Sequence, residues 1–273
     1  ESLRKISATN TRLGDAGLRE LERLPALRYL DLFGTDVSDA GLESIGRMSS
    51  LSHLYLSATT VTDLGLAALV GLEDIVELGV DHSKITDRGL EHVTGFRHLE
   101  RLRLNGTRIS DVGERTISAI TSLRRLELND TVISDSSVGD LLKLTALEEL
   151  ELNGTTLSDR GLGELESLGA LERLSVRDTD VSASGIETFK VRRPDVELTF
   201  ESEPSKFSWI GIALSILYGL IALAICLYGA HRYLLIWLFV RHRGVRSAQA
   251  PASTFSELPP VTIQIPLFNE RNV

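Results

Sequence analysis

Apolar residues recur with a period of 24 along the first 200 residues, without insertion from Leu3 to Phe200. Each unit opens with the spacing Leu-x-x-Leu-x-Leu, and the alternation in its last three positions predicts a short strand whose alternate side chains face inward. A fixed period of this length indicates a solenoid, in which each repeat stacks on the next. The middle column of the three contains Ile6, Leu30, Leu54, Leu78, Leu102, Leu126, Leu150, Leu174 and Leu198.

A hydroxyl, an aspartate and a second apolar stripe follow each strand. The hydroxyl column is suited to hydrogen bonding with a turning backbone, and the aspartate column predicts helix N-caps. Apolar residues spaced by three then predict a helix with one face on the core. The hydroxyl residues are Thr11, Thr35, Thr59, Ser83, Thr107, Thr131, Thr155 and Thr179. The aspartates are Asp15, Asp39, Asp63, Asp87, Asp111, Asp135 and Asp159.

These columns resemble the 24-residue leucine-rich repeats found in many bacterial and F-box-type proteins, which carry Leu-x-x-Leu-x-Leu-x-x-Thr-x-Ile-[Ser/Thr]-Asp-x-Gly-Leu. The resemblance covers residues 3–200 and implies an α/β solenoid with a parallel sheet on the concave side and helices on the convex side, a shape used mostly for binding. Two repeats depart from it. Glu114 replaces an apolar residue, and Ala183 and Arg192 replace an aspartate and an apolar residue, as expected of a terminal repeat.

Outward strand positions form two rows that would lie on the concave side. The first row is Lys5, Tyr29, His53, Glu77, Arg101, Arg125, Glu149 and Arg173, and the second is Ser7, Asp31, Tyr55, Gly79, Arg103, Glu127, Glu151 and Ser175. Neighbours within a row alternate in charge towards the C-terminal end, which predicts cross-strand ladders of ion pairs. Such ladders are typical of a solvated face and contribute little energy.

Four aromatic or imidazole side chains, Tyr29, Phe33, His53 and Tyr55, gather in the second and third repeats. Side chains on the outward positions have no core to fill. We therefore interpret them as a candidate ligand-binding patch, for a protein anchor or for stacking on a glycan.

The sequence of the repeats contains no candidate catalytic site and no candidate metal site. His82, His92 and His98 are close in sequence, but the register places them in a turn, on a convex helix and before a strand. They would not converge on one metal ion. The repeats contain no nucleophile motif and no glycine-rich phosphate loop, so we expect a binding domain without activity of its own. The only cysteine, Cys226, excludes an intrachain disulfide.

Charge is distributed unevenly between the two parts of the chain. Residues 1–203 contain 23 Lys and Arg against 36 Asp and Glu, whereas residues 204–273 contain 6 against 2. An acidic repeat domain makes nucleic acid an unsuitable partner.

The segment Phe207–Ala230 has 24 residues without a charged side chain or histidine, enough for one transmembrane helix. The basic segment 231–246 follows it, and the positive-inside rule then places the repeats outside the cytoplasm and the C-terminal part inside. We expect 231–246 to lie along the inner leaflet and 247–260 to be a linker. Because the chain starts at Glu1 and stops directly after a strand-like run, we expect it to be part of a longer protein.

The residues Pro259–Val273 read Pro-Pro-Val-Thr-Ile-Gln-Ile-Pro-Leu-Phe-Asn-Glu-Arg-Asn-Val and resemble the opening strand of family 2 glycosyltransferases, notably the cellulose-synthase-like and glucomannan-synthase branch. The resemblance implies that 261–273 starts an incomplete α/β domain, with a nucleotide-sugar pocket near Pro266, Phe268, Asn269 and Glu270. It also implies Mg²⁺ or Mn²⁺ in the complete enzyme, although 261–273 holds none of the family's catalytic aspartates. We therefore expect the chain to be the N-terminal part of a membrane-bound glycosyltransferase. The alternative is that it is a single-span repeat receptor or adhesion protein without catalytic activity.

Overall fold

The chain divides into two units, residues 1–203 and 204–273. The computed structural model describes residues 3–200 of the first unit and, in the second, residues 216–218, 220, 233–235, 237–238 and 241, which are all helical. No helix in this described part is long and apolar enough to cross a membrane. Most of the expected span Phe207–Ala230 and of the basic segment lies outside the described residues, and so do the linker and the terminal strand.

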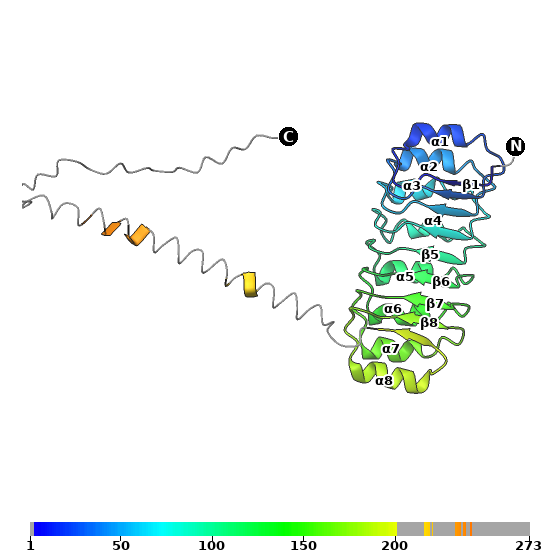
Figure 1. Cartoon of the computed structure of the whole chain (residues 1–273). Coiled ribbons are helices and arrows are strands. Elements are labelled where there is room, and N and C mark those ends of the chain that lie inside the picture. Colours follow the sequence, from blue (N-terminus) through cyan, green and yellow to red (C-terminus); the bar gives the residue numbers. More distant parts are fainter. Residues whose placement is uncertain are drawn as a thin grey trace, which may run out of the picture. The chain divides into compact units, whose positions relative to one another are not determined.

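The first unit is built on one parallel sheet whose strands follow chain order, with β1 and β9 at its edges (Figure 1). The strands are β1 (Lys5–Ser7), β2 (Tyr29–Asp31), β3 (His53–Tyr55), β4 (Glu77–Gly79), β5 (Arg101–Arg103), β6 (Arg125–Glu127), β7 (Glu149–Glu151), β8 (Arg173–Ser175) and β9 (Glu197–Thr199). Each strand is followed by a return segment, so the connections are the crossovers that parallel strands require.

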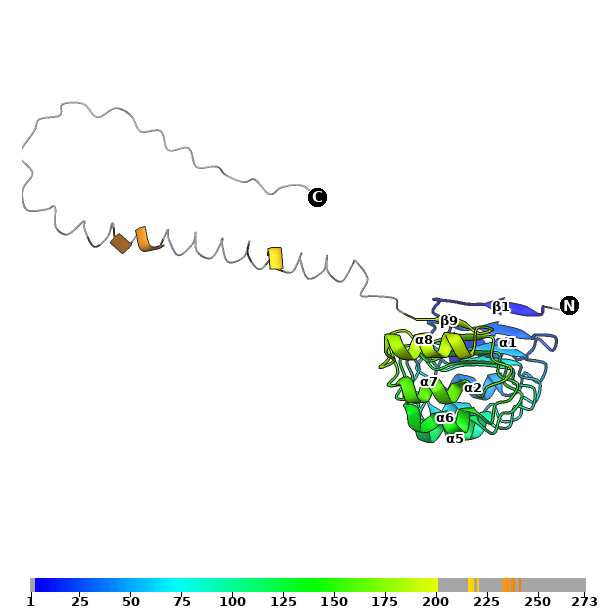
Figure 2. The same cartoon turned by 90° about the horizontal axis from the view of Figure 1, so that it is seen from below.

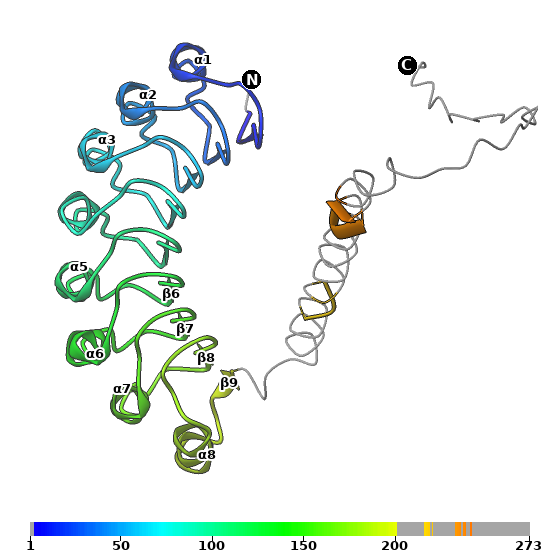
Figure 3. The same ribbon diagram turned by 90° about the vertical axis from the view of Figure 1, so that its left-hand side faces the viewer.

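Helices cover the other side of the repeats. They are α1 (Asp15–Leu21), α2 (Asp39–Ile45), α3 (Asp63–Ala67), α4 (Leu90–Val93), α5 (Asp111–Ile117), α6 (Asp135–Leu141), α7 (Asp159–Leu165) and α8 (Ala183–Arg192). The sheet lines the concave side and the helices line the convex side (Figure 3), which confirms the predicted solenoid. The stack runs from α1 to α8 in Figure 1, and Figure 2 shows it from below, with α8 nearest the viewer.

The register of the sheet equals the sequence period. Lys5 pairs with Tyr29, which pairs with His53, and the same offset of 24 residues continues to the last pair, Arg173 with Glu197. Each residue therefore stacks on its own counterpart in the next repeat. The two outer residues of a strand face the concave side, and its middle residue faces the core.

The core is one continuous cluster between the sheet and the helices. The middle strand residues from Leu30 to Leu174 are at most 1% exposed. Full burial of one leucine side chain stabilises by about 1.5–3 kcal/mol. A single repeat could not cover these residues.

Each strand ends in a turn that closes with the predicted hydroxyl. Thr35 donates from Oγ1 to the carbonyl oxygen of Leu32 at 2.7 Å, and Thr131 donates to Leu128 at 2.6 Å. The residue before the hydroxyl has a left-handed backbone in every repeat, for example φ 64° at Gly34 and φ 55° at Asp130. This conformation suits Gly, Asn and Asp; Ala58 and His82 also adopt it.

The prediction that the aspartates are N-caps is wrong. In six of the seven repeats the N-cap is the residue before the aspartate, usually Ser or Thr, and the aspartate is the first residue of the helix. Asp87 is the exception, because it precedes α4, whose N-cap is Gly89. The carboxylate of the aspartate instead reaches the next repeat: Asp111 accepts from the backbone N–H of Ser134 at 2.8 Å and from the Ser134 hydroxyl at 2.6 Å. The serine hydroxyl in turn accepts from Ser136 N at 3.2 Å. We call this arrangement the aspartate clamp.

The clamp recurs in all seven repeats that contain the aspartate. The pairs are Asp15 with Ser38, Asp39 with Thr62, Asp63 with Thr86, Asp87 with Ser110, Asp111 with Ser134, Asp135 with Ser158 and Asp159 with Ser182. The glycine two residues after the aspartate makes room for the previous carboxylate. A Cβ at Gly113 would lie 2.3 Å from Asp87 Oδ1.

The last repeat closes the stack with polar groups, as its departures predicted. Ala183 replaces the aspartate at the start of α8, so no clamp leaves this repeat. Arg193 is only 13% exposed along its side chain. Its guanidinium donates to the carbonyl oxygens of Glu166, Leu168 and Leu171 at 2.8–3.1 Å, which satisfies backbone acceptors at the end of the core.

Glu114 is an ionisable residue inside the apolar helix stripe, between Leu90 and Val138. Its side chain is 0% exposed, and neither carboxyl oxygen has a hydrogen-bond partner in the described part of the chain. Burial, followed by the charge of Asp140, raises the pKa of Glu114 to about 8. The carboxyl is therefore protonated at neutral pH, because the neutral form costs less to bury.

Removing one clamp is expected to weaken the junction between two repeats. Asp111→Ala deletes two hydrogen bonds to a charged acceptor and should lower the free energy of unfolding by about 2–4 kcal/mol. Asp74→Ala, at an exposed aspartate outside the clamps, is the control and should change it by less than about 0.5 kcal/mol. Urea unfolding of both variants measures the difference. Equal effects would contradict a role for the clamp.

Glu114 should make stability depend on pH. Between about pH 4.3, where an unfolded glutamate loses its proton, and pH 8, the folded chain retains the proton that the unfolded chain has released. Stability is therefore lost as pH rises through this window, by up to about 1.4 kcal/mol per pH unit. Glu114→Gln and Glu114→Leu should remove this slope in urea unfolding measured across the window. A slope unchanged in both variants would contradict the burial of an isolated carboxyl.

Candidate functional site

The concave face consists of the outward residues of the strands together with the residue two positions after each strand. The predicted charge ladders are confirmed on it. Arg101 contacts Glu77 at 3.4 Å, and Arg103 contacts Glu127 at 3.2 Å. Glu149 pairs with Arg125 on one side and with Arg173 on the other. The charges of this part of the face are largely neutralised by their neighbours.

A third, mostly polar row was missing from the prediction, except for Phe33. It contains Thr9, Phe33, Ser57, Asp81, Asn105, Asn129, Asn153 and Arg177. Its asparagines join the ends of successive strands: the Oδ1 atom of Asn105 accepts from Asn129 N at 2.9 Å, and that of Asn129 accepts from Asn153 N at 2.9 Å. The recurrence of one polar residue type after the strand is the sequence signal that would have revealed this row.

Asp81 in the third row organises the centre of the face. Its side chain is 5% exposed, and its carboxylate contacts Arg103 Nη2 at 3.0 Å. It also accepts from the Ser57 hydroxyl at 2.9 Å and from Asn105 N at 3.0 Å. Coulombic attraction by Asp81, Glu127 and Glu77 outweighs burial and raises the pKa of Arg103. The positive charge of Arg103 is therefore balanced by neighbouring carboxylates of the same chain.

The structure brings three of the four predicted patch residues together. The rings of Tyr29 and Tyr55 are 5.3 Å apart between centroids, and Phe33, which is 39% exposed, lies in the same hollow. We call this the aromatic hollow. It has a volume of about 290 Å³ and is lined by Thr9, Tyr29, Asp31, Phe33, Tyr55, Ser57 and Arg103.

Gly79 allows Tyr55 to lean along the face. A Cβ at this position would lie only 3.0 Å from Tyr55 Cδ1, so the tyrosine ring fills the space above the backbone of β4. Burial, followed by a hydrogen bond with Glu77, raises the pKa of Tyr55 above its ordinary value. The phenol is thus held in its neutral form against the neighbouring carboxylate.

His53 is placed beside the hollow and does not line it. Its ring is 6.0 Å from that of Tyr29 between centroids. Its Nδ1 atom is 2.9 Å from the Ser52 hydroxyl, which orients the ring along the edge of β3. His53 therefore supports Tyr29 from one side.

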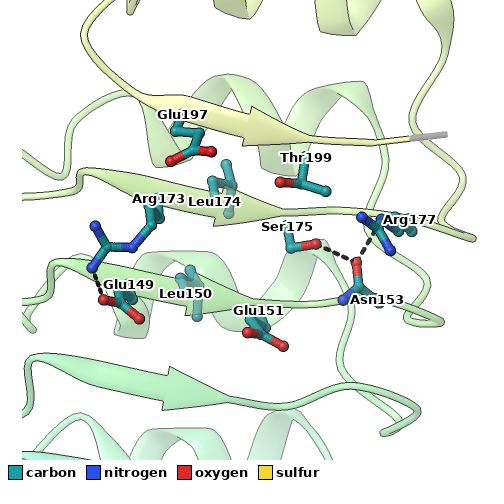
Figure 4. Close-up of a pocket in the computed structure, with 10 residues that line it drawn as sticks. All are labelled: Glu149, Leu150, Glu151, Asn153, Arg173, Leu174, Ser175, Arg177, Glu197 and Thr199. Carbon is teal, nitrogen blue, oxygen red and sulfur yellow. Dashed lines mark hydrogen bonds and ion pairs between the residues drawn. The ribbon is translucent and has the colours of Figure 1, made fainter. Parts of the chain in front are cut away.

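A second hollow lies over β7, β8 and β9, with a volume of about 270 Å³ (Figure 4). Its lining is polar and internally bonded. Arg173 points to Glu149, and the Ser175 hydroxyl donates to Asn153 at 2.8 Å. Its lining contains no aromatic side chain.

The three histidines of the sequence analysis lie apart in the part of the chain that the structure describes. There, no group of three His, Cys, Asp or Glu side chains is arranged to hold a metal ion. His82 is exposed in a turn, His92 lies on α4 and His98 precedes β5. The predicted nucleotide-sugar residues Pro266, Phe268, Asn269 and Glu270 lie outside the described residues, so that site stays a prediction.

Comparison with known proteins identifies the repeats. The family model described as "Leucine-rich repeat region" matches residues 3–183. Internalin C2 of Listeria monocytogenes has a similar solved structure, with a TM-score of 0.56 and 23% identity over 72% of this chain and 80% of that one. The internalin InlF of the same bacterium gives a TM-score of 0.55 and 19% identity over 74% of this chain and 62% of its own length. No curated protein sequence matches significantly.

Proposed function

The chain belongs to the leucine-rich repeat family, and we propose that its repeats bind a protein partner through the concave face, with the aromatic hollow as the principal contact. The observation that carries this proposal is the cluster of Tyr29, Phe33 and Tyr55 around one hollow. Large aromatic side chains dominate the binding energy of protein interfaces. The rest of the face is a ladder of mutually paired charges, which suits a polar rim.

A glycan is the second ligand class for the same hollow, because an aromatic ring beside hydroxyl and carboxylate groups also suits a sugar ring. We favour a protein. The solenoid presents a long concave surface, well beyond the hollow itself, and such surfaces engage extended partners.

We further propose that the repeats are held outside the cytoplasm by a membrane helix at Phe207–Ala230, with the C-terminal part inside. The uncharged run and its basic flank support this proposal. The described residues 216–218 and 220, within the run, are helical and have exposed apolar side chains. Exposed apolar groups on a helix favour a lipid environment.

The whole protein, in this proposal, is a membrane-bound family 2 glycosyltransferase that makes a polysaccharide or glycolipid from a nucleotide sugar. Support comes from the resemblance of Pro259–Val273 to the first strand of that family. Pro266, Phe268, Asn269 and Glu270 would contribute to the donor pocket, and Mg²⁺ or Mn²⁺ would be bound by aspartates of the complete enzyme. The competing proposal is a repeat receptor or adhesion protein, and the presence or absence of an Asp-x-Asp motif after Val273 decides between them.

Photo-crosslinking tests the binding face in cells. We expect p-benzoylphenylalanine at position Phe33 to give a discrete protein adduct, because this side chain lines the hollow. The same residue at Val112, which is 69% exposed on the helix side, is the matched control and should give none. Tyr29→Ala should reduce the adduct at least tenfold. Adducts of equal yield at both positions would contradict the concave face as the binding surface.

Cysteine labelling tests the topology. We expect a cysteine at Ser205 to react with an impermeant reagent on intact cells, and a cysteine at Ser253 to react only after permeabilisation, because the Arg-rich flank stays in the cytoplasm. Each cysteine is introduced separately into a Cys226→Ser variant, so that the introduced cysteine is the only one in the 273-residue sequence. The reverse labelling pattern would contradict the proposed orientation.

A further inference from the structure

Asp31 presents a negative charge to the aromatic hollow. Its carboxylate accepts hydrogen bonds from the hydroxyls of Ser7 at 3.3 Å and Thr9 at 3.0 Å, and from Phe33 N at 3.1 Å. No basic side chain in the described part of the chain forms an ion pair with it. A carboxylate has about four acceptor directions, so a further donor can bind.

Arg103 and Glu77, two charged groups beside Tyr55, are already matched. Arg103, the only basic residue of the hollow's lining, contacts both Asp81 and Glu127. Glu77 contacts Arg101 and hydrogen-bonds with Tyr55. The charge left without an ionic partner in the lining is therefore negative.

The aromatic rings of the hollow are compatible with a cation. Lys5 Nζ lies 4.0 Å from the centroid of the Tyr29 ring, so an ammonium group already occupies one side of this cluster. The pKa of Tyr29 is raised, first by burial and then by the charges of Asp31 and Glu77. The Lys5 contact and the charges of these two carboxylates indicate that positive charge is favoured here.

The size of the hollow limits what it can receive. Its volume of about 290 Å³ is at the lower end of the range of about 300–1,000 Å³ typical of pockets for drug-sized ligands. A space of this size holds about one long side chain, and Phe33, Tyr55 and Asp31 all line it. A nucleotide sugar or an oligosaccharide chain would extend well beyond it.

We propose that the aromatic hollow receives one cationic side chain of the protein partner, an arginine or a lysine, with Asp31 as its counter-ion. This proposal rests on the proposed function, since it names the chemistry that the concave face selects. In this proposal Asp31 selects the positive charge of the bound side chain, and the aromatic rings pack against it. Arginine suits the site better than lysine because its planar guanidinium both stacks on rings and forms two parallel hydrogen bonds with a carboxylate.

Immobilised peptides test this selectivity with the full chain in detergent. The probes are three peptides of equal length in which three positions are arginine, citrulline or glutamate; citrulline has nearly the shape of arginine without its charge. We expect the arginine peptide to bind at least tenfold more tightly than the citrulline peptide, and added salt to weaken it. Asp31→Asn, which keeps an acceptor for Phe33 N, should lower the affinity about tenfold. Glu197→Gln, at an exposed carboxylate on β9, should leave it unchanged.

Equal binding of the arginine and citrulline peptides, preference for the glutamate peptide, or equal effects of Asp31→Asn and Glu197→Gln would each overturn the proposal. Thermal unfolding of both variants establishes that they are folded. The crosslink at Phe33 keeps the two proposals apart. A protein adduct there together with failure of the arginine peptide would retain the concave face and reject the cationic side chain, whereas loss of the adduct would reject both.

Discussion

The equality between the sequence period and the strand register governs the whole repeat domain. Because each Cα partner lies 24 residues further along the chain, every side chain meets its own counterpart in the next repeat. Leucines then stack on leucines in the core, and the same bond between an aspartate and a serine or threonine recurs at successive junctions. No repeat can bury its inner face alone, so stability resides in the junctions between repeats. A change at one position affects the repeats on either side of it.

This regularity explains what the sequence could predict. The inward columns, the strand and helix order and the ion pairs of Arg101, Arg125 and Arg173 follow from the period and from the alternation within a strand. Interactions between side chains and the backbone of another repeat do not. An aspartate at the start of a helix fits an N-cap as well as a clamp, and only the positions of Ser38 or Ser134 in space distinguish the two. The sequence named Tyr29, Phe33 and Tyr55, which line the hollow, but its shape could not be predicted, because it depends on how Tyr55 leans over Gly79.

The concave face combines two kinds of surface on one scaffold. Towards β5–β8, arginines and glutamates are paired with one another, which leaves little net attraction for a charged ligand. Towards β1–β4, aromatic rings and a carboxylate without an ionic partner remain available. The similarity to internalins concerns the fold, at 19–23% identity. The chemistry of the face belongs to this chain's own outward residues, which vary from repeat to repeat, whereas the core columns are apolar with few exceptions.

The polar end of the last repeat also has a consequence for assembly. The clamp has a direction, since each aspartate bonds to the serine or threonine of the repeat that follows it. Ala183 interrupts this sequence of bonds, and the Arg193 guanidinium covers the carbonyl groups of Glu166, Leu168 and Leu171. A second solenoid approaching this end would find no clamp aspartate at the start of α8. Surfaces that join head to tail without closing grow into filaments, and the missing clamp removes one bond on which such a junction between two chains would depend.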